Sequence, residues 1–352
     1  MYHVPPRLRF RGCGAVLAAA LAAGLVLAAC GSSASSTTPP SSSASGSSGK
    51  ALNIAYLSFA VENSYDAPML AAAQAVALDN HATMKVFDAN NSPQTQYSQL
   101  QDVIASGQYN GIILQPIFGT GLLTLVKQAI SKGIKVVNMD QILGPNLSTD
   151  QPQVTGLSAN VTFVPTDIGT KLGNLVVQAC KAKNLNPCQV GYLYDIKASA
   201  LDVAISGAFN KAIAADPAVK VVAQGQSFFS PTTGLTAVQD MLQAKPSLNL
   251  IVGSDQGIEG GAQALASAHK TGKVILVGYG ASAAALAGVA SGAWYADVAQ
   301  APASEGRLAV QALVTALRTG KSSGGIDPVA GLPDGGIVTK ANVSQFTAEW
   351  PG

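Results

Sequence analysis

The chain has 352 residues, 48% of them hydrophobic and only 11% charged, and its formal net charge is +2 at pH 7. Three of its 21 basic residues, Arg7, Arg9 and Arg11, precede an N-terminal apolar run; without them, 18 basic and 19 acidic residues leave a charge near −1. No basic stripe interleaved with aromatic residues is present, which argues against nucleic acid as a partner. The residues from position 50 onward are too many for one typical core, so two domains are expected.

The N-terminal segment has the order of a secretory signal. The three arginines are followed by an apolar run over 14–29, which is short for a membrane-spanning helix but normal for a signal peptide. Leu27-Ala28-Ala29-Cys30 resembles the lipobox of bacterial lipoproteins, which are cleaved before a cysteine that then carries lipid. The alternative is a chance cysteine after an apolar helix. We therefore predict a signal peptide over 1–29 and an extracytoplasmic protein anchored to the cell membrane through Cys30.

Residues 31–49 consist only of Ser, Thr, Gly, Ala and Pro. Such a composition buries too little apolar surface to offset the entropy of ordering the chain. We predict that 30–49 is a flexible tether between the lipid anchor and the folded part.

From position 52 onward, short apolar runs alternate with helical stretches. Strands are predicted over 52–58, 84–89, 111–115, 134–139, 153–157, 189–194, 219–225, 248–253, 274–278 and 294–299. Helices are predicted over 67–80, 95–107, 121–132, 167–182, 201–216, 232–244, 257–270, 281–290 and 303–319. This alternation predicts an α/β fold of parallel sheets flanked by helices, in two Rossmann-like halves whose strand ends face a shared cleft. The polar and aromatic loop over 59–66 follows the first strand and is therefore the first candidate binding loop.

Two cysteines remain in the folded part, Cys180 and Cys188. Outside the cytoplasm, a disulfide is the default for a pair at this spacing. A metal or redox pair is the alternative, but no histidine lies nearby and the spacing is not Cys-x-x-Cys. We predict a structural disulfide.

The sequence lacks the residues that most enzymes need. Its three histidines are His3, His81 and His269, which leaves few schemes based on a catalytic or metal-ligating histidine. Ser267 and Lys270 fit a Ser-x-x-Lys pattern by chance, without companion motifs, and no phosphate-binding Gly-x4-Gly-Lys loop occurs. We predict a protein that is not an enzyme and has no cofactor or metal.

Several short motifs occur in the order found in one family of receptors. They are Asn63-Ser64-Tyr65, Leu114-Gln115-Pro116, Val137-Asn138-Met139-Asp140, Gly169-Thr170-Lys171-Leu172-Gly173, Gly253-Ser254-Asp255, Gly260-Gly261-Ala262, Val277-Gly278-Tyr279 and Ala299-Gln300-Ala301-Pro302. Each is weak alone. Together they resemble the type I periplasmic binding proteins, the solute receptors of ABC importers, and especially their ribose-binding-like sugar group.

The resemblance implies a monomeric, two-lobed receptor that closes around a small solute and delivers it to an ABC permease. It implies three hinge crossings, near 160–165, 298–301 and 325–336. The N-terminal lobe would then comprise 51–163 with 301–325, and the C-terminal lobe 164–300 with 335–350.

The resemblance also implies a set of ligand-binding residues. Tyr65, Phe229 and Tyr279 match aromatic positions of the cleft, while Asp140, Asp255 and Gln300 match polar ones. The further polar candidates are Asn63, Asp66, Gln115, Gln141 and Thr166.

Four positions depart from the pattern of the sugar receptors. Gln141 stands where an arginine is expected, Ile205 lies near the place of a second arginine, Gly280 replaces an aspartate and Asp66 replaces an aromatic residue. Beyond the signal, the only arginines are Arg307 and Arg318. Without arginine in the cleft, bidentate binding of a carboxylate or phosphate is disfavoured. We therefore predict a neutral sugar or polyol other than ribose, with an amine-bearing or nucleoside-like solute as the alternative.

Two other functions share this fold. A transcriptional repressor would need an N-terminal helix-turn-helix, and the signal-like segment occupies that place. A ligand sensor for a membrane signalling partner remains an alternative to the importer receptor.

Overall fold

The first sheet contains six strands and is parallel throughout. The structure is a computed structural model that describes residues 51–352. In spatial order the strands are β11 (Gly324–Ile326), β5 (Ala159–Thr162), β4 (Lys135–Asp140), β3 (Gly111–Leu114), β1 (Asn53–Ser58) and β2 (Thr83–Asp88). Because β1 lies between β2 and β3, the strand order reverses at β1, and such a switch point is a common ligand site in parallel sheets.

The second sheet repeats this order with later strands. Its strands are β12 (Ile337–Thr339), β10 (Ala296–Ala299), β9 (Ile275–Gly280), β8 (Leu250–Val252), β6 (Cys188–Tyr194) and β7 (Val219–Gln226). The pairing of β12 with β10 is antiparallel, and the other pairings are parallel. The predicted fold class, two parallel-dominated sheets flanked by helices, is confirmed.

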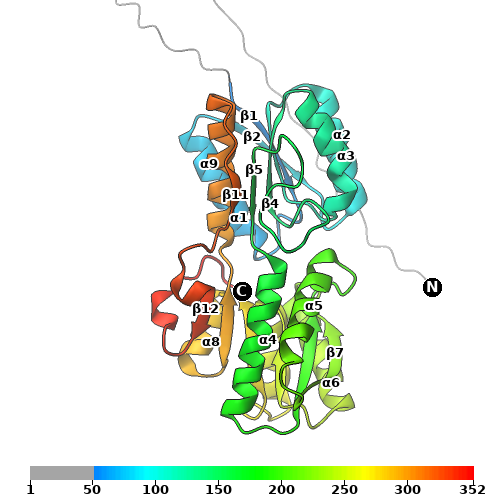
Figure 1. The fold of residues 1–352 in the computed structure, drawn as a ribbon, viewed down its shortest axis with the longest axis vertical. Coiled ribbons are helices and arrows are strands. Elements are labelled where there is room, and N and C mark those ends of the chain that lie inside the picture. The colour runs from blue at the N-terminus through cyan, green and yellow to red at the C-terminus, as the bar shows by residue number, and fades with distance from the viewer. Residues whose placement is uncertain (1–50) are drawn as a thin grey trace, which may run out of the picture. The chain divides into compact units, whose positions relative to one another are not determined.

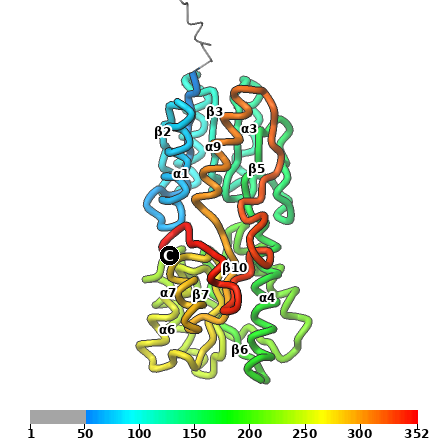
Figure 2. Tube along the Cα trace, turned by 90° about the vertical axis from the view of Figure 1, so that its left-hand side faces the viewer, coloured from blue at the N-terminus to red at the C-terminus, as the bar shows by residue number. Residues whose placement is uncertain are grey.

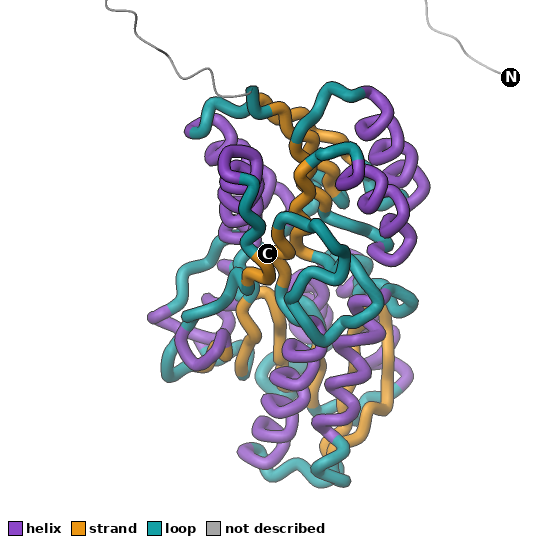
Figure 3. Tube along the Cα trace, turned by 45° about the horizontal axis from the view of Figure 1, so that its top comes forward, coloured by secondary structure: helices purple, strands orange, loops and turns teal. Residues whose placement is uncertain are grey.

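Helices cover both faces of each sheet (Figures 1 and 3). The first sheet lies between α1 (Asp66–Asp79) with α9 (Pro302–Thr319) and α2 (Pro93–Ser106) with α3 (Gly119–Ser131). The second lies between α4 (Pro165–Ala182) with α5 (Ala200–Ile213) and α6 (Pro231–Ala244), α7 (Asp255–Ser267) and α8 (Ala283–Ser291). We call each sheet with its helices the first lobe and the second lobe.

Alternation of side chains along the strands explains this layering. In β1, Ile54 and Tyr56 pack in the core under α1 and α9, whereas Ala55 and Leu57 pack under α2 and α3. Successive residues of a strand point to opposite faces, so a strand buried on both faces is apolar throughout. The unbroken apolar runs of the sequence therefore become central strands.

The chain passes between the two sheets three times. The connections are 163–164 between β5 and α4, 300–301 between β10 and α9, and 327–336 between β11 and β12. Figure 2 shows β10 of the second lobe continuing into the long helix α9 of the first. These connections lie where the carboxyl ends of the strands of both sheets meet.

The predicted helices all occur, with ends shifted by at most three residues. Ser92 caps α2 by accepting a hydrogen bond from the Thr95 N–H at 3.1 Å, and Pro93 is the first residue of the helix.

The strand predicted over 153–157 is wrong, because this stretch is a loop and the strand is β5. Val154 and Leu157 of this loop are buried against the α2–α3 side of the first sheet, so their apolar pattern serves loop packing. The sequence also missed β11 and β12, which have three residues each and lie at sheet edges.

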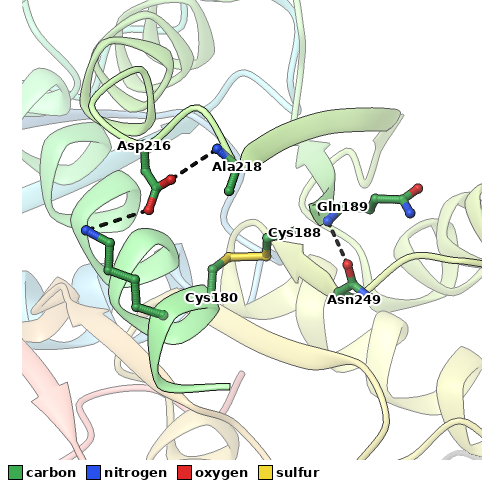
Figure 4. The surroundings of a disulfide bond; sticks show 7 residues. Cys180, Cys188, Gln189, Asp216, Ala218 and Asn249 are labelled. Atoms are coloured by element: carbon green, nitrogen blue, oxygen red, sulfur yellow. Dashed lines mark hydrogen bonds and ion pairs between the residues drawn. A yellow bond between two sulfur atoms is a disulfide. The ribbon is translucent and has the colours of Figure 1, made fainter. Parts of the chain in front are cut away.

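Cys180, near the end of α4, and Cys188, the first residue of β6, form the predicted disulfide (Figure 4). The Asp216 carboxylate beside it accepts a hydrogen bond from the Ala218 N–H at 3.0 Å and lies 3.6 Å from the Lys181 ammonium. The disulfide joins the start of β6 to α4, the helix that covers it.

The predicted signal peptide, the lipidated Cys30 and the tether lie outside the described residues. Within 51–352, no helix is both long enough and apolar enough to cross a membrane.

Candidate functional site

A cavity lies between the two lobes at the carboxyl ends of their strands. Its space amounts to about 500 Å³ when the solvent at its mouth is included. The lining residues are Phe59, Asn63, Tyr65, Asp66, Gln115, Asp140, Gln141, Phe163, Leu201, Phe229, Ser254, Gln256, Tyr279, Gln300 and Trp350. The position is the one expected for a ligand of parallel sheets.

The first lobe contributes a polar wall built around Gln115. The Gln115 Oε1 accepts a hydrogen bond from the Phe59 N–H at 2.9 Å, which fixes the orientation of the amide. Its Nε2 then donates to Asp66 Oδ1 at 2.6 Å and to Asp140 Oδ2 at 3.1 Å. We call Asp66, Gln115 and Asp140 the first wall.

The carboxyl groups of the first wall are almost fully buried. Asp66 is 6% exposed and Asp140 is 5% exposed. Burial raises the pKa of Asp140 to about 6, while the Gln115 and Gln141 side chains act in the opposite direction. Burial, and then the charge of Asp140, raise the pKa of Asp66 well above its usual value. No lysine or arginine lines the cavity, so these carboxylates present acceptors without a cationic partner from its lining.

Tyr65 stands beside the first wall. Its N–H donates to Asn63 Oδ1 at 2.8 Å, and its hydroxyl donates to Glu305 Oε1 at 3.1 Å. Glu305 is fully buried, and burial raises its pKa well above the usual value. These contacts hold the ring of Tyr65 at the cavity.

The second lobe contributes a wall that is more apolar, formed by Leu201, Phe229, Ser254 and Tyr279, which we call the second wall. Phe229 has a φ of 53°, a left-handed conformation that is rare for a bulky residue. A conformation of this kind persists only where the surrounding structure holds it, and it is common at ligand sites.

A buried aspartate lies behind the second wall. Asp195 accepts hydrogen bonds from the hydroxyls of Ser227, Ser254 and Tyr279. Burial and then the neighbouring charge of Asp202 raise its pKa to about 6, although these three donors act against the rise. The hydroxyl of Tyr279 therefore serves the interior of the lobe, while its ring lines the cavity.

Two residues from the sequence-based set, Asp255 and Thr166, do not line the cavity. Asp255 is fully buried beneath it, where its Oδ2 accepts from the Ser282 N–H at 2.7 Å. Asp297 is its buried neighbour and accepts from the Ala281 N–H at 2.8 Å. Thr166 faces a separate surface depression between α4, α5 and the loop after β4. The other nine predicted residues line the cavity.

Contacts across the cavity join the two lobes. Gln256 Nε2, in α7, donates to Ser64 Oγ at 3.0 Å and to Asn63 Oδ1 at 3.2 Å. Phe59 and Phe229 meet edge to face with their ring centroids 6.4 Å apart. The loop after β1 therefore contacts the second lobe through polar and through aromatic side chains.

The sequence missed six lining residues, namely Phe59, Phe163, Leu201, Ser254, Gln256 and Trp350. Phe59 belongs to the candidate loop, and Ser254 and Gln256 flank Asp255, so proximity to strand ends could have found them. Trp350 carried no such signal, because it follows the last strand of the sheets by more than ten positions.

The cavity has the features of a binding site. Neither histidine of the described part, His81 or His269, lines it. Within residues 51–352, no cluster of three or more potential metal ligands occurs. The arrangement can accept hydrogen bonds on one side and pack against a ring or an apolar face on the other.

The sequence of this chain is similar to a family model and to two named binding proteins. The family model described as periplasmic binding protein domain matches residues 54–322. The D-allose-binding periplasmic protein of Escherichia coli (strain K12) is 28% identical over 253 residues, 70% of this chain and 77% of that protein. The ribose import binding protein RbsB of Bacillus subtilis (strain 168) is 29% identical over 229 residues, 64% and 69% of the two chains.

A solved structure has a similar fold. It is an ABC transporter periplasmic solute binding protein from Actinobacillus succinogenes 130z with bound D-allose, 20% identical to this chain. The TM-score is 0.72, and the match covers 84% of this chain and 100% of the other.

Proposed function

The chain belongs to the periplasmic binding protein domain family, and on this premise we propose that it captures a sugar or polyol in the cavity and delivers it to an ABC permease. Members of this family are binding proteins. The observation that carries the proposal is the first wall, two buried carboxylates bridged by one amide, in a cavity that the aromatic residues of the second wall also line. The relatives named for D-allose and ribose support the same ligand class.

The chemistry of the two walls suits a polyhydroxylated ring. Carboxylates accept short, strong hydrogen bonds from hydroxyl groups, and each hydroxyl of a sugar is a donor. The C–H groups on the face of a sugar ring can pack against the negative face of an aromatic side chain. Asp66 and Asp140 would bind the hydroxyls while Phe229 and Tyr279 contact the ring face. The absence of arginine from the lining favours a neutral ligand over a carboxylate or phosphate.

Closure of the lobes would enclose the ligand. We propose that residues 51–163 with 301–325, and 164–300 with 335–350, move as two bodies about the three connections between the sheets. The hydrogen bonds from Gln256 to Asn63 and Ser64 would form on closure and break on opening. A permease could then distinguish the closed, loaded receptor from the open one.

The N-terminal sequence supports a working location outside the cytoplasm. A lipoprotein signal over 1–29 and a lipid on Cys30 would hold a monomeric receptor on the outer side of the cytoplasmic membrane. We propose no catalytic activity, because no histidine lines the cavity and the relatives named above are binding proteins.

A second candidate is a solute that carries an amine. The first wall holds two carboxylates and the lining holds no cation, so an ammonium group would be attracted there. Aromatic residues nearby would add cation–π attraction. A pair of ligands that differ only in one amino group, such as glucose and glucosamine, separates the two candidates.

A thermal-shift screen tests the proposal. The purified protein is heated with D-allose, other aldoses, inositols, linear polyols, nucleosides and amino sugars, one at a time. A ligand present at about 100 times its dissociation constant adds about 2.7 kcal/mol of stability, which is readily detected. Stabilisation by a neutral sugar or polyol is the expected result. Stabilisation by amines alone would favour the second candidate, and no stabilisation by any member would overturn the ligand class.

A further inference from the structure

The last residues of the chain form part of the cavity, although they lie outside the segment matched by the family model. In the second lobe they are tied to the start of α8, where the N–H groups of Ala283 and Ala284 donate to the carbonyls of Trp350 and Pro351 at 2.9 and 3.1 Å. In Figure 2 this segment, in red next to the C label, lies below the blue loop at the lower end of the first lobe. The C-terminal segment, 349–352, is thus placed at the boundary between the lobes.

The ring of Trp350 is held tightly at the cavity. It is 4% exposed, and its Nε1–H donates to the Gly280 carbonyl at 2.7 Å. Gly280 has a φ of 145°, and a Cβ at this position would lie 2.5 Å from Cζ2 of the Trp350 ring. The absence of a side chain at position 280 therefore makes room for the indole.

The same segment also contacts the first lobe. Trp350 meets Tyr65 edge to face, with ring centroids 5.3 Å apart. The preceding residue, Glu349, accepts a hydrogen bond from the Ser304 N–H at 2.7 Å and another from the Ser304 hydroxyl. Ser304 lies in the first turn of α9, where the helix dipole favours a carboxylate.

We propose that Trp350 is a ligand-contacting residue that closes the cavity, and that Glu349 is a positioning residue that ties it to the first lobe. Trp350 is bonded to the second lobe and packs on Tyr65 of the first. Separation of the lobes removes that contact, so the indole completes the site only in the closed form. The inference rests on the proposed function, since it assigns a residue to the same ligand.

The chain offers a matched control for this proposal. It contains two tryptophans, Trp294 and Trp350. Trp294 is 5% exposed and packs in the core of the second lobe, outside the cavity lining. In the variant Trp294→Phe, the only remaining tryptophan is therefore Trp350 at the cavity. In Trp350→Phe, the only remaining tryptophan is Trp294 in the core.

The first experiment records tryptophan emission and acrylamide quenching with and without D-allose, or with whichever panel solute stabilises the wild-type protein. In Trp294→Phe, the ligand should shift the emission and reduce quenching at least twofold. In Trp350→Phe, the ligand should leave both unchanged. A ligand that binds Trp294→Phe without altering its fluorescence would overturn the assignment of Trp350.

The second experiment measures affinity by calorimetry, with unfolding followed in parallel. We expect Trp350→Phe to weaken binding about tenfold, and Trp294→Phe to change it less than twofold. Adding Glu349→Gln to Trp294→Phe should increase quenching of the ligand-free protein and weaken binding about threefold. Unchanged affinity in Trp350→Phe would refute the role of the indole. Quenching in the double variant Trp294→Phe, Glu349→Gln that equals quenching in Trp294→Phe would refute the role of Glu349. If no panel solute binds the wild-type protein, the proposed function itself fails, and this inference fails with it.

Discussion

The two walls of the cavity use their carboxyl groups in opposite ways. In the first wall, Asp66 and Asp140 share one amide and line the cavity. In the second lobe, Asp195 lies behind the wall and accepts from three hydroxyl groups, two of them on Ser254 and Tyr279 of the wall itself. The carboxylates of the first wall can therefore accept hydrogen bonds from a ligand. The carboxylate of Asp195 already accepts hydrogen bonds from hydroxyl groups inside the second lobe.

This difference assigns different tasks to the two lobes. A buried carboxylate with few donors costs free energy in the empty protein, and a ligand that donates hydrogen bonds recovers part of it. A carboxylate saturated by hydroxyls stabilises the surface that it supports. We infer that the first wall determines which polar groups bind, whereas the second wall provides a rigid face for packing.

The largest expected effect is the loss of a first-wall acceptor. The variant Asp140→Ala should weaken binding of the stabilising solute by at least tenfold, because hydrogen bonds to charged groups contribute about 1.5–3 kcal/mol. Calorimetric titration measures it. The matched control is Asp167→Ala, which removes an exposed aspartate paired with Lys171. Equal affinities of Asp140→Ala and the wild type would remove Asp140 from the site.

The pH dependence of stability sharpens the comparison. The pKa of Asp140 is about 6 in the folded protein, above its unfolded value, so the folded state binds this proton more tightly. Its contribution to stability is therefore fully present at low pH and is lost as the pH rises through about 6. Without ligand, the wild type should lose about 1–2 kcal/mol from this group between about pH 5 and about pH 7.5.

The variant Asp140→Asn isolates that contribution. It should lose less stability than the wild type over the same pH interval and be the more stable of the two near pH 7.5, although it binds ligand more weakly. Urea unfolding at both pH values provides the comparison. Parallel pH profiles of the two proteins would show that Asp140 titrates like an exposed carboxyl.

A smaller effect is expected where a hydroxyl serves the interior of the second lobe. The variant Tyr279→Phe keeps the ring but removes one donor to Asp195, so it should lower the free energy of unfolding by about 1 kcal/mol. Affinity for the ligand should change by less than about threefold. A large loss of affinity with unchanged stability would mean that this hydroxyl contacts the ligand.

The smallest effect is expected at Thr166, which the sequence suggested as a ligand residue. Its side chain lies at a surface depression outside the cavity. The variant Thr166→Ala should bind the solute as the wild type does, as measured in the same titration. A fivefold or greater loss would place this part of α4 in the site.

The sequence predicted the fold better than the site. Helical stretches and buried apolar strands alternate regularly along the sequence, and this alternation is a strong signal for an α/β fold. The apolar pattern predicted a strand wrongly over 153–157, because Val154 and Leu157 belong to a loop that packs against the first sheet. It also failed for β11 and β12, which are too short to have a period.

The site was predictable where it follows strand ends in order. Asp140, the last residue of β4, and Gln115, which follows β3, were found through their place in the receptor motifs, and both strands end at the cavity. Asp255 occupies a similar position in the sequence, but its side chain points into the lobe toward Ser282 and Asp297. Trp350 reaches the cavity only through tertiary contacts of the C-terminal segment, which local sequence does not encode.

We infer that the first wall binds the polar groups of a captured solute while the aromatic residues pack on its face. A crystal structure with the solute selected by the thermal-shift screen would locate these contacts. We expect ligand hydroxyls within hydrogen-bonding distance of Asp66 and Asp140, with the ring against Phe229, Tyr279 and Trp350. A ligand bound outside this cavity, or one oriented with its hydroxyls toward the second wall, would contradict this inference.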